Sequence, residues 1–341
     1  MDVGSGRERV KLETQGGRVQ YAVFNPNGNI LATASQLGQI MTWDVESGRE
    51  ITRLNSRGPI PVHVQFSPDG DLLESASVHG VAQIWDATTG AELAILKTSG
   101  QLPNAVFSPD GQLVLTATND NVARILKTDG SEFRALAGHQ NRITAAAFSP
   151  DGLLVLTGSL DRTARLWSIK DGSNVATLKG HSDVVTDVAF SPNGQLLLTA
   201  SSDGTARIWS TRDGKEKIIL RGHRGSVDTA SFSPNGSYVL TASSADRTVR
   251  LWAVESGRLI AVLASQEDEA NRPALTRAVF SPDGTRIAIV SGAEGVRIVR
   301  AFPTIQDVID YAKRAVPRKL TPCERRRFFL PVSGDVGDCP S

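Results

Sequence analysis

Three histidines lie in sequence contexts that could assemble a hydrolytic site. His139 is followed by Thr157 after 18 residues and by Asp161 after 22. A hydroxyl, an imidazole and a carboxylate are the groups of a nucleophile, a general base and an orienting acid. The same residue types recur twice downstream, as His181, Thr199 and Asp203 and as His223, Thr241 and Asp246. An enzyme needs one such site, so three copies at an interval of 42 residues indicate architecture, not catalysis.

The interval belongs to a repeat that spans most of the 341 residues. Its marker is Phe-Ser-Pro-Asp-Gly or Phe-Ser-Pro-Asn-Gly, with a weaker first copy, Phe-Asn-Pro-Asn-Gly. The seven copies begin at Phe24, Phe66, Phe107, Phe148, Phe190, Phe232 and Phe280. Their spacings are 42, 41, 41, 42, 42 and 48 residues, which is the sequence signature of a repeat architecture.

Each repeat has room for four short strands and no helix. In the fifth copy, apolar residues alternate from Val184 to Phe190, which is the period of a strand with two unlike faces. The Pro192–Gly194 turn leads to a second strand, Leu196 to Ser201, and polar turns precede a third, Thr205 to Trp209, and a fourth, Lys217 to Leu220. One such sheet cannot bury both faces alone, whereas seven arranged radially can.

With these features the chain resembles the WD40 family of β-propellers. Trp-Asp stands at 43–44 and 85–86, and Gly-His stands at 138–139, 180–181 and 222–223. All five tryptophans occupy one repeat position: Trp43, Trp85, Trp167, Trp209 and Trp252. The resemblance implies an all-β, seven-bladed propeller over residues 1–302, whose last blade is closed by an N-terminal strand near residues 9–13. A short α-helical tail at 303–341 would follow, its last ten or so residues disordered.

The resemblance also assigns the triplicated residues a structural role. In this family Trp, Ser or Thr, His and Asp form a hydrogen-bonded tetrad that ties the strands of a blade to its entry loop. The three complete sets here are His139, Thr157, Asp161 and Trp167; His181, Thr199, Asp203 and Trp209; and His223, Thr241, Asp246 and Trp252. Blades 1 and 2 have Leu37 and His79 where the Asp would stand, and blade 3 has Leu126 at the Trp position and no Gly-His.

Propellers of this family bind peptides or proteins on loops around the central channel. The corresponding rim positions are Arg57, Gln140, Asn141, Arg142, Ser182, Asp183, Arg224, Ser226, Glu267, Asp268 and Glu269. They combine arginines with acids and contain no aromatic residue, which disfavours an aromatic cage or a base-stacking platform. We expect a protein partner, with the chain acting as a monomer or within a hetero-complex. Ordinary solvated loops are the alternative for each position.

The tail resembles the C-terminal segment of bacterial multidomain WD40 proteins, which carry a TIR, caspase-like, kinase or STAND-type NTPase unit ahead of the propeller. The matching stretches are Asp310 to Arg318 and Leu320 to Arg326. Upstream, Ile305, Val308, Ile309, Ala312, Ala315 and Val316 recur at helical spacing. This resemblance implies a sensor or adaptor module of a bacterial regulatory system.

Composition narrows the remaining possibilities. The 37 basic and 36 acidic residues give a net charge of +1, so no broad basic field favours nucleic acid. No apolar run approaches the roughly 18 residues of a membrane span. Two cysteines cannot form a four-thiolate site, and His63 and His79 are expected to be strand or turn residues, not metal ligands. We therefore expect a cytoplasmic, non-enzymatic scaffold that needs no cofactor or metal and does not engage a membrane.

Two other functional classes stay open. A propeller enzyme would show His, Asp and Arg from different blades converging at the channel, and a nucleic-acid module would show a basic stripe on one face. Arg124, Arg165, Arg207, Arg250 and Arg297 stand two residues before the Trp position or its substitute. They could form an anion-binding ring, or they are the polar positions of the third strands, which keep the guanidinium in water.

Overall fold

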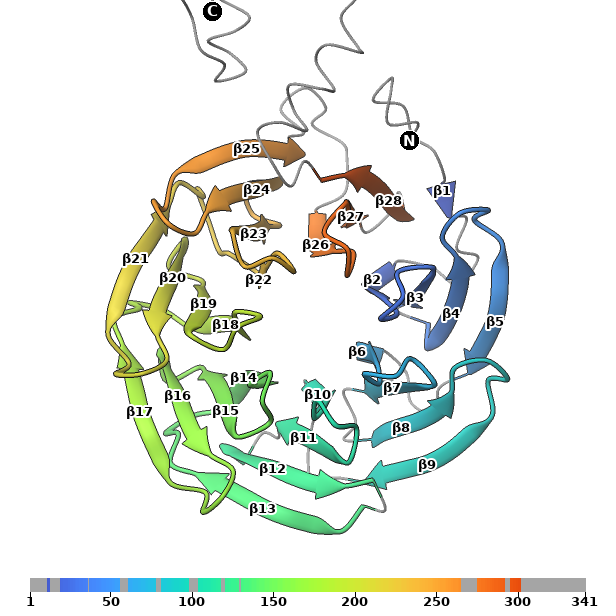
Figure 1. The fold of residues 1–341 in the computed structure, drawn as a ribbon, viewed down its shortest axis with the longest axis horizontal. Helices are drawn as coiled ribbons and strands as arrows, with labels where there is room; N and C mark the ends of the chain where they lie inside the picture. The colour runs from blue at the N-terminus through green and yellow to red at the C-terminus, as the bar shows by residue number, and fades with distance from the viewer. Residues whose placement is uncertain are drawn as a thin grey trace, which may run out of the picture.

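The computed structural model describes residues 11–12, 19–35, 37–55, 61–77, 81–97, 104–117, 120–128, 130–264, 275–291 and 295–301. These residues form seven four-stranded antiparallel sheets, arranged as blades around a common axis (Figure 1). The predicted all-β, seven-bladed propeller is confirmed. The predicted helical tail lies outside the described residues. Among the described residues, no helix has the length and hydropathy needed to cross a bilayer.

Four blades cover the first half of the ring. Blade 1 consists of β2 (Val19–Phe24), β3 (Ile30–Ser35), β4 (Gln39–Asp44) and β5 (Glu50–Asn55). Blade 2 consists of β6 (Pro61–Phe66), β7 (Leu72–Ser77), β8 (Val81–Asp86) and β9 (Glu92–Lys97). Blade 3 consists of β10 (Asn104–Phe107), β11 (Leu113–Ala117), β12 (Val122–Lys127) and β13 (Glu132–Ala137). Blade 4 consists of β14 (Ile143–Phe148), β15 (Leu154–Ser159), β16 (Thr163–Ser168) and β17 (Asn174–Lys179).

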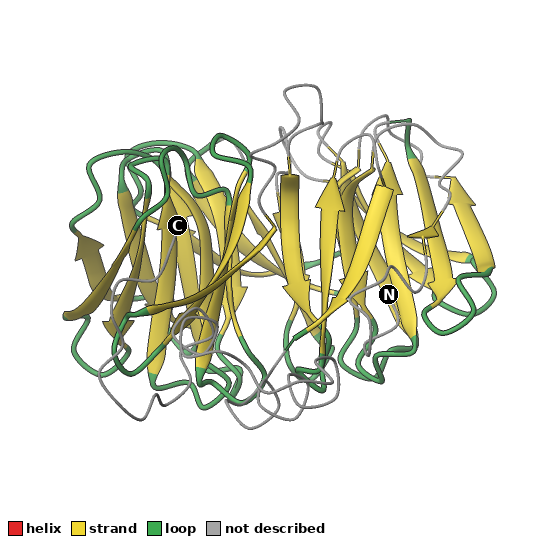
Figure 2. Ribbon diagram, turned by 90° about the horizontal axis from the view of Figure 1, so that it is seen from above, coloured by secondary structure: helices red, strands yellow, loops and turns green. Residues whose placement is uncertain are grey.

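The other three blades complete the ring. Blade 5 consists of β18 (Val185–Phe190), β19 (Leu196–Ser201), β20 (Thr205–Ser210) and β21 (Glu216–Arg221). Blade 6 consists of β22 (Thr229–Phe232), β23 (Tyr238–Ser243), β24 (Thr248–Ala253) and β25 (Leu259–Ala264). Blade 7 consists of β26 (Leu275–Phe280), β27 (Arg286–Ser291), β28 (Gly295–Arg300) and the N-terminal β1 (Lys11–Leu12). The first strand of each blade is innermost, and the loops gather on the two faces of the disc (Figure 2).

The turn between the first two strands shows why the marker sequence recurs. In blade 5 the Gly194 amide donates to the Ser191 carbonyl at 2.8 Å, and the Leu196 amide donates to the Ser191 hydroxyl oxygen at 2.9 Å. Gly194 has φ of +69°, a left-handed conformation that glycine adopts without steric cost. Ser, Pro, Asn or Asp, and Gly therefore each perform a backbone task in the hairpin.

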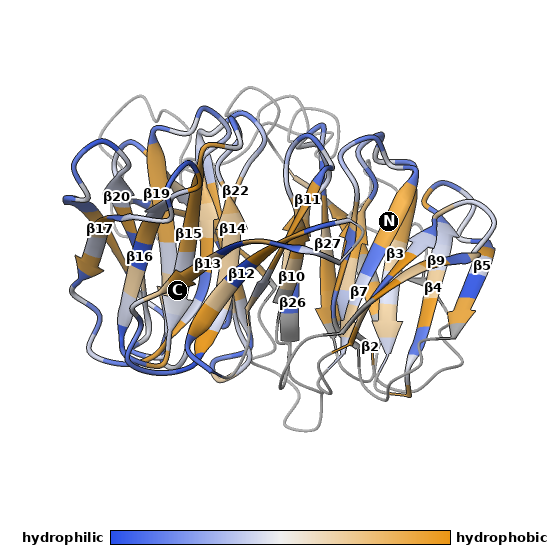
Figure 3. Cartoon of the chain, turned by 90° about the horizontal axis from the view of Figure 1, so that it is seen from below, coloured by the Kyte–Doolittle hydropathy of each residue, from blue (hydrophilic) through white to orange (hydrophobic). Residues whose placement is uncertain are grey.

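The core lies between the blades. Seven buried apolar clusters are described, one for each pair of neighbouring blades. Between blades 4 and 5, Leu166 and Leu178 pack with Val188, Leu197 and Trp209. Apolar positions concentrate along the strands and hydrophilic ones in the loops (Figure 3). Each fully buried Leu contributes about 1.5–3 kcal/mol, so neighbouring blades stabilise one another.

Closure of the ring joins the two ends of the repeat region. β1 pairs with β28 in antiparallel register, with Lys11 opposite Arg297 and Leu12 opposite Val296. The outer strand of the last blade thus comes from the beginning of the chain.

Deleting residues 1–14 is expected to lower the melting temperature by about 5 °C or more, because the edge of β28 and the interface between blades 7 and 1 lose their cover. Calorimetry measures this directly. Deletion of residues 1–8 alone is the control and should leave the melt unchanged. An unchanged melt after the longer deletion would contradict this account of closure.

Candidate functional site: tetrads and the rim of blades 4 to 6

In blade 5 the structure brings together the four residues of one predicted set. His181 Nδ1 lies 2.9 Å from Asp203 Oδ2, and His181 Nε2 lies 2.7 Å from Thr199 Oγ1. Trp209 Nε1 donates to Thr199 Oγ1 at 2.9 Å. One direction satisfies the chain: the indole donates to the hydroxyl, the hydroxyl donates to Nε2 and Nδ1–H donates to the carboxylate. This direction has a neutral imidazole, in agreement with the pKa of His181, which burial lowers.

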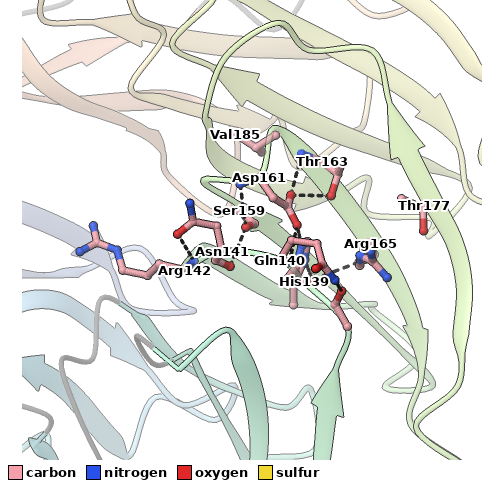
Figure 4. A network of polar contacts seen from close by, with 12 residues as sticks. His139, Gln140, Asn141, Arg142, Ser159, Asp161, Thr163, Arg165, Thr177 and Val185 are labelled. Atoms are coloured by element: carbon pink, nitrogen blue, oxygen red, sulfur yellow. Dashed lines mark hydrogen bonds and ion pairs between the residues drawn. The ribbon is translucent and has the colours of Figure 1, made fainter.

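Blades 4 and 6 repeat this geometry. In blade 4, His139 lies 2.8 Å from Asp161 Oδ2 (Figure 4). His139 also lies 2.8 Å from Thr157 Oγ1, and Trp167 Nε1 lies 2.8 Å from the same hydroxyl. In blade 6 the corresponding distances are 2.9 Å for His223–Asp246, 2.7 Å for His223–Thr241 and 2.8 Å for Trp252–Thr241. The extra residue of blade 6 is absorbed in the turn before Asp246.

Packing explains the glycine of each Gly-His pair. A Cβ atom on Gly180 would lie 2.6 Å from a guanidinium nitrogen of Arg207 and 3.1 Å from the six-membered ring of Trp209. The tryptophan and the arginine two residues before it therefore pack closely against this backbone, and a side chain at Gly180 would require both to shift. The described arginines at this position contact acidic or aromatic groups: Arg124 pairs with Asp120 at 2.6 Å, Arg207 pairs with Glu216, and Arg165 lies over Trp167. These arginines lie in the third strands, as the second of the two interpretations predicted. The side chains of Arg124, Arg207 and Arg250 are only 25%, 12% and 14% exposed, so their guanidinium groups pair with acids and are not left in water as expected. The Arg297 side chain lies outside the described residues.

Burial removes the tetrads from solvent. The relative exposure of the hydroxyl-bearing Thr157, Thr199 and Thr241 is 0%, 0% and 1%. Each of these oxygens already accepts from an indole and contacts an imidazole. A substrate carbonyl cannot reach these oxygens, so the tetrad serves as a structural link between the strands of its blade and the entry loop.

The pKa shifts of the tetrad residues agree with neutral imidazoles beside ionised carboxylates. Burial lowers the pKa of His139, His181 and His223, and the adjacent Asp carboxylates only partly oppose this. Burial acts against the charge of Asp203, but hydrogen bonds from Thr205, His181 and the Ser182 amide hold its pKa at about 2. The pKa of Asp161 is also about 2, and that of Asp246 is lowered.

The same carboxylates hold the loops that enter each blade. The second hydrogen bond of Oδ2 comes from a backbone amide: Gln140 at 3.0 Å, Ser182 at 3.1 Å and Arg224 at 2.9 Å. In blade 4 the Ser159 hydroxyl also donates to the Asn141 carbonyl at 2.9 Å (Figure 4). Each entry loop of blades 4–6 is therefore held by its tetrad carboxylate, and the blade 4 loop is held at a second point by Ser159.

Most of the rim residues proposed for these three blades face solvent. Gln140, Asn141, Ser182, Asp183 and Arg224 are exposed, and Arg142 and Ser226 are half-buried. Figure 4 shows the Arg142 side chain directed away from the His139–Asp161 pair. The other proposed rim residues, Arg57, Glu267, Asp268 and Glu269, lie outside the described residues.

Two further arginines join this rim, and the sequence argument missed them. Arg162 has φ of +69° and Arg247 has φ of +57°, at the turn position that Gly204 fills in blade 5. Bulky residues rarely adopt this conformation, which is maintained only where the surroundings enforce it. The Leu160 amide donates to the Arg142 carbonyl at 2.9 Å, which places this turn against the entry loop. Asp-Arg-Thr in place of Asp-Gly-Thr was the available sequence signal.

The other blades keep only part of the tetrad. Trp43 Nε1 donates to Thr33 at 2.8 Å and Trp85 Nε1 donates to Ser75 at 3.0 Å, but Leu37, at the Asp position of blade 1, is 71% exposed. Leu126 takes the tryptophan position of blade 3 and is buried. His79 lies outside the described residues.

A second polar cluster links blades 7, 1 and 2 near the axis. The guanidinium carbon of Arg277 lies 3.8 Å from the ring centroid of Tyr21, which lies 4.9 Å from that of His63. His63 Nδ1 lies 3.3 Å from Glu74 Oε2. Tyr21, His63 and Arg277 each stand three residues before the marker Phe, as does Asp187 of blade 5, whose Oδ2 accepts from the Ala230 amide at 3.0 Å. The sequence argument assigned His63 to a strand or turn, and it lies in β6, but this cluster was not foreseen.

The cluster contains a His, an acid (Glu74) and an Arg, the residue types that a propeller enzyme would present, but the His63–Glu74 pair is buried. His63 is 5% exposed and Glu74 is 0% exposed. Burial lowers the pKa of His63 to about 3, with the positive charge of Arg277 adding to the effect, and burial raises the pKa of Glu74 well above its usual value. Burial also raises the pKa of Tyr21 to about 12, against the opposing charge of Arg277. Within the described ranges, no three His, Cys, Asp or Glu side chains gather as metal ligands would.

Comparison with known families agrees with this geometry. The family model described as WD domain, G-beta repeat, matches residues 130–168, 172–210 and 214–253. The chain contains WD40 repeats. A search of curated proteins finds no match to it.

The three matched WD40 repeats are those with complete tetrads. Each match runs from the turn or outer strand of one blade to the third strand of the next, and each contains one Gly-His pair and one tryptophan. The other four blades of the propeller, which the family model does not match, follow the same strand order with weaker markers. The complete tetrads, the family matches and the entry loops held by tetrad carboxylates therefore all fall in blades 4–6.

Proposed function

We propose that this WD40 propeller is a non-enzymatic protein-interaction scaffold whose docking surface is the rim of blades 4–6. The observation that carries the proposal is the double use of each tetrad carboxylate, which binds a buried histidine and also the entry-loop amide of Gln140, Ser182 or Arg224. A rim held in this way loses little conformational freedom when a partner binds, which favours affinity.

Charge indicates the chemistry of the partner. The described loops of this arc carry four arginines that are exposed or half-buried. Outside the tetrads they also carry one exposed carboxylate, Asp183, and one half-buried carboxylate, Asp228. The arginines are Arg142, Arg162, Arg224 and Arg247. Guanidinium groups bind carboxylates through paired hydrogen bonds, so an acidic protein segment suits this surface.

The tail supports a finer proposal. The stretches Asp310 to Arg318 and Leu320 to Arg326 resemble the C-terminal segment of bacterial multidomain WD40 proteins. We therefore place the scaffold in a bacterial regulatory or signalling system, as its sensor or adaptor part. Two cysteines in 341 residues accord with a reducing cytoplasm.

Changing Arg142 and Arg224 together to Glu is expected to weaken capture of the cognate protein partner by about tenfold or more, because two attractive contacts become repulsive. Quantitative affinity capture at two salt concentrations measures the loss and its screening.

The matched control changes Lys170 and Arg212 together to Glu. Both residues are exposed in turns on the opposite face, and the net charge changes equally. Capture that survives the Arg142 and Arg224 changes, or that fails equally in the control, would contradict the assigned surface.

A further inference from the structure

The unpaired charges on the rim of blades 4–6 change sign from blade to blade. They are Arg142 and Arg162 in blade 4, Asp183 in blade 5, and Arg224 and Arg247 in blade 6, all exposed or half-buried. Within the described part of the chain, none of these side chains forms an ion pair. The three blades are neighbours in the ring (Figure 1). Along this arc the order of charge is therefore positive, negative, positive.

The negative charge of Asp183 is not required by the loop that carries it. Asp183 Oδ1 accepts a hydrogen bond from the Val184 amide at 2.7 Å. In blade 4 the uncharged Asn141 occupies this position, and its Oδ1 accepts from the Arg142 amide at 2.8 Å. Asp228 of blade 6 differs, because its carboxylate accepts a backbone amide of its own blade at 2.6 Å. Asp183 thus carries a charge that the loop itself does not use.

The positive charges on the turns of blades 4 and 6 are not required by the backbone either. The Arg162 amide donates to the Ser159 carbonyl at 3.2 Å, and in blade 5 the Gly204 amide makes the same bond to Ser201 at 3.2 Å. Arg162 and Arg247 hold a positive φ that glycine adopts without steric cost and that a bulky residue adopts at a cost. The two arginines therefore add charge to the rim without a benefit to the turns that carry them.

Small residues join the surfaces of blades 5 and 6 between these charges. A Cβ atom on Gly204 would lie 3.3 Å from the Gly225 carbonyl oxygen, so the turn of blade 5 lies directly against the entry loop of blade 6. Across the same boundary the Ser226 hydroxyl donates to the Ser202 hydroxyl at 3.2 Å. Glycine and serine allow another backbone to approach closely, while the longer side chains on either side reach its charges.

We infer that this arc binds an extended protein segment whose charges run acidic, basic, acidic, with the basic residue opposite Asp183. The inference rests on the proposed docking surface and adds to it the order of the partner's charges. A like charge opposite Asp183 would cost affinity, so a segment that is acidic throughout fits this arc less well. The rim thus distinguishes partners by the order of their charges as well as by their net charge.

Two synthetic peptides test the order of charges when they are bound to the full chain at low ionic strength. One carries glutamates at both ends and a lysine at its centre, separated by glycines. The other is an isomer in which the lysine is moved to one end. The first peptide is expected to bind about threefold more tightly, which is the contribution of one exposed ion pair. Fluorescence anisotropy of the labelled peptides measures both dissociation constants.

Asp183→Asn tests the role of the central carboxylate. The variant keeps its fold, because an amide oxygen accepts the following backbone amide at this position in blade 4. It should bring the two affinities together, since the first peptide loses an attractive contact and the isomer loses a repulsive one. A surface that recognises negative charge alone would instead bind both peptides more tightly. The matched control is Asp213→Asn, an equal change of charge in an exposed turn on the opposite face, which should leave the difference intact.

The outcomes separate this inference from the docking surface on which it rests. Equal affinity of the native protein for the two peptides, or tighter binding of both by the Asp183→Asn variant, would overturn the order of charges and leave the docking surface in place. Peptides that bind equally well after Arg142 and Arg224 are changed to Glu would overturn both proposals. Native protein that binds neither peptide would also overturn both.

Discussion

Replacing Asp203 by alanine is expected to lower the free energy of unfolding at pH 7 by about 3 kcal/mol. The carboxylate receives hydrogen bonds from His181 Nδ1 at 2.9 Å, from the Ser182 amide at 3.1 Å and from the Thr205 amide and hydroxyl at 2.9 and 2.6 Å. Alanine leaves these donors without a partner in a site that water reaches poorly. The loss is large because several buried donors depend on one side chain.

Asp120→Ala is the matched control. Asp120 occupies the same repeat position in blade 3, but its side chain is 37% exposed and pairs with Arg124 at 2.6 Å. Exposed ion pairs contribute about 0–1 kcal/mol, so this change should cost less than about 1 kcal/mol. Urea unfolding compares the two variants. Equal losses in the two blades would contradict the view that the complete tetrad stabilises blade 5.

Acid should weaken the native protein through the same tetrads. Because the folded pKa of Asp203 is about 2, below its usual value near 4, its contribution is complete above pH 4 and is lost as the pH falls toward 2. His181 also has a lowered pKa, so the unfolded chain binds a proton more readily and stability falls below about pH 6.5. Asp203→Ala should therefore flatten the pH dependence of stability between pH 4 and 2.

The sequence predicts the blades and the tetrads well because both are local in the repeat. A strand period of two, a turn marker and a fixed spacing place His181, Thr199, Asp203 and Trp209 within one sheet, without knowledge of the other blades. The arrangement of each tetrad follows once the register is known.

The cluster near the axis could not be foreseen in this way. Tyr21, His63 and Arg277 stand at one repeat position but in three blades, and only closure of the ring brings them together. Arg162 and Arg247 were missed because an Asp-Arg-Thr turn reads as an ordinary polar loop, whereas its positive φ is visible only in the structure. Composition and spacing do not show which residues of different repeats come into contact. They also do not show where a repeat forces an unusual residue into a positive φ.

Glu74→Leu is expected to raise the free energy of unfolding at pH 8 by about 2 kcal/mol. Glu74 is fully buried, and its Oε1 has no hydrogen-bond partner among the residues that the structure describes. Leucine fills the same register in blades 3 to 6, as Leu115, Leu156, Leu198 and Leu240, each at most 1% exposed. The site is therefore shaped for leucine, and the gain from burying it exceeds the cost of about 1 kcal/mol for leaving His63 Nδ1 without its partner.

The pH dependence of this gain identifies its cause. Burial raises the folded pKa of Glu74, so the folded protein holds a proton that the unfolded chain releases above about pH 4.5. The contribution of Glu74 to native stability therefore falls as the pH rises through this window, and the advantage of Glu74→Leu should grow from pH 5 to pH 8. Urea titrations at several pH values measure it, with Glu255→Gln as the control because Glu255 is exposed.

The sign of the change in the free energy of unfolding shows the charge state of the His63–Glu74 pair. A neutral His63 beside a protonated Glu74 follows from the burial of both groups and from the positive charge of Arg277 near the imidazole. A charged pair would behave in the opposite way, because removal of the carboxylate would strand a buried imidazolium and destabilise the fold by about 3–5 kcal/mol. Stabilisation at pH 8 would show that His63 and Glu74 join β6 and β7 of blade 2 as neutral groups, and destabilisation would show that they form an ion pair.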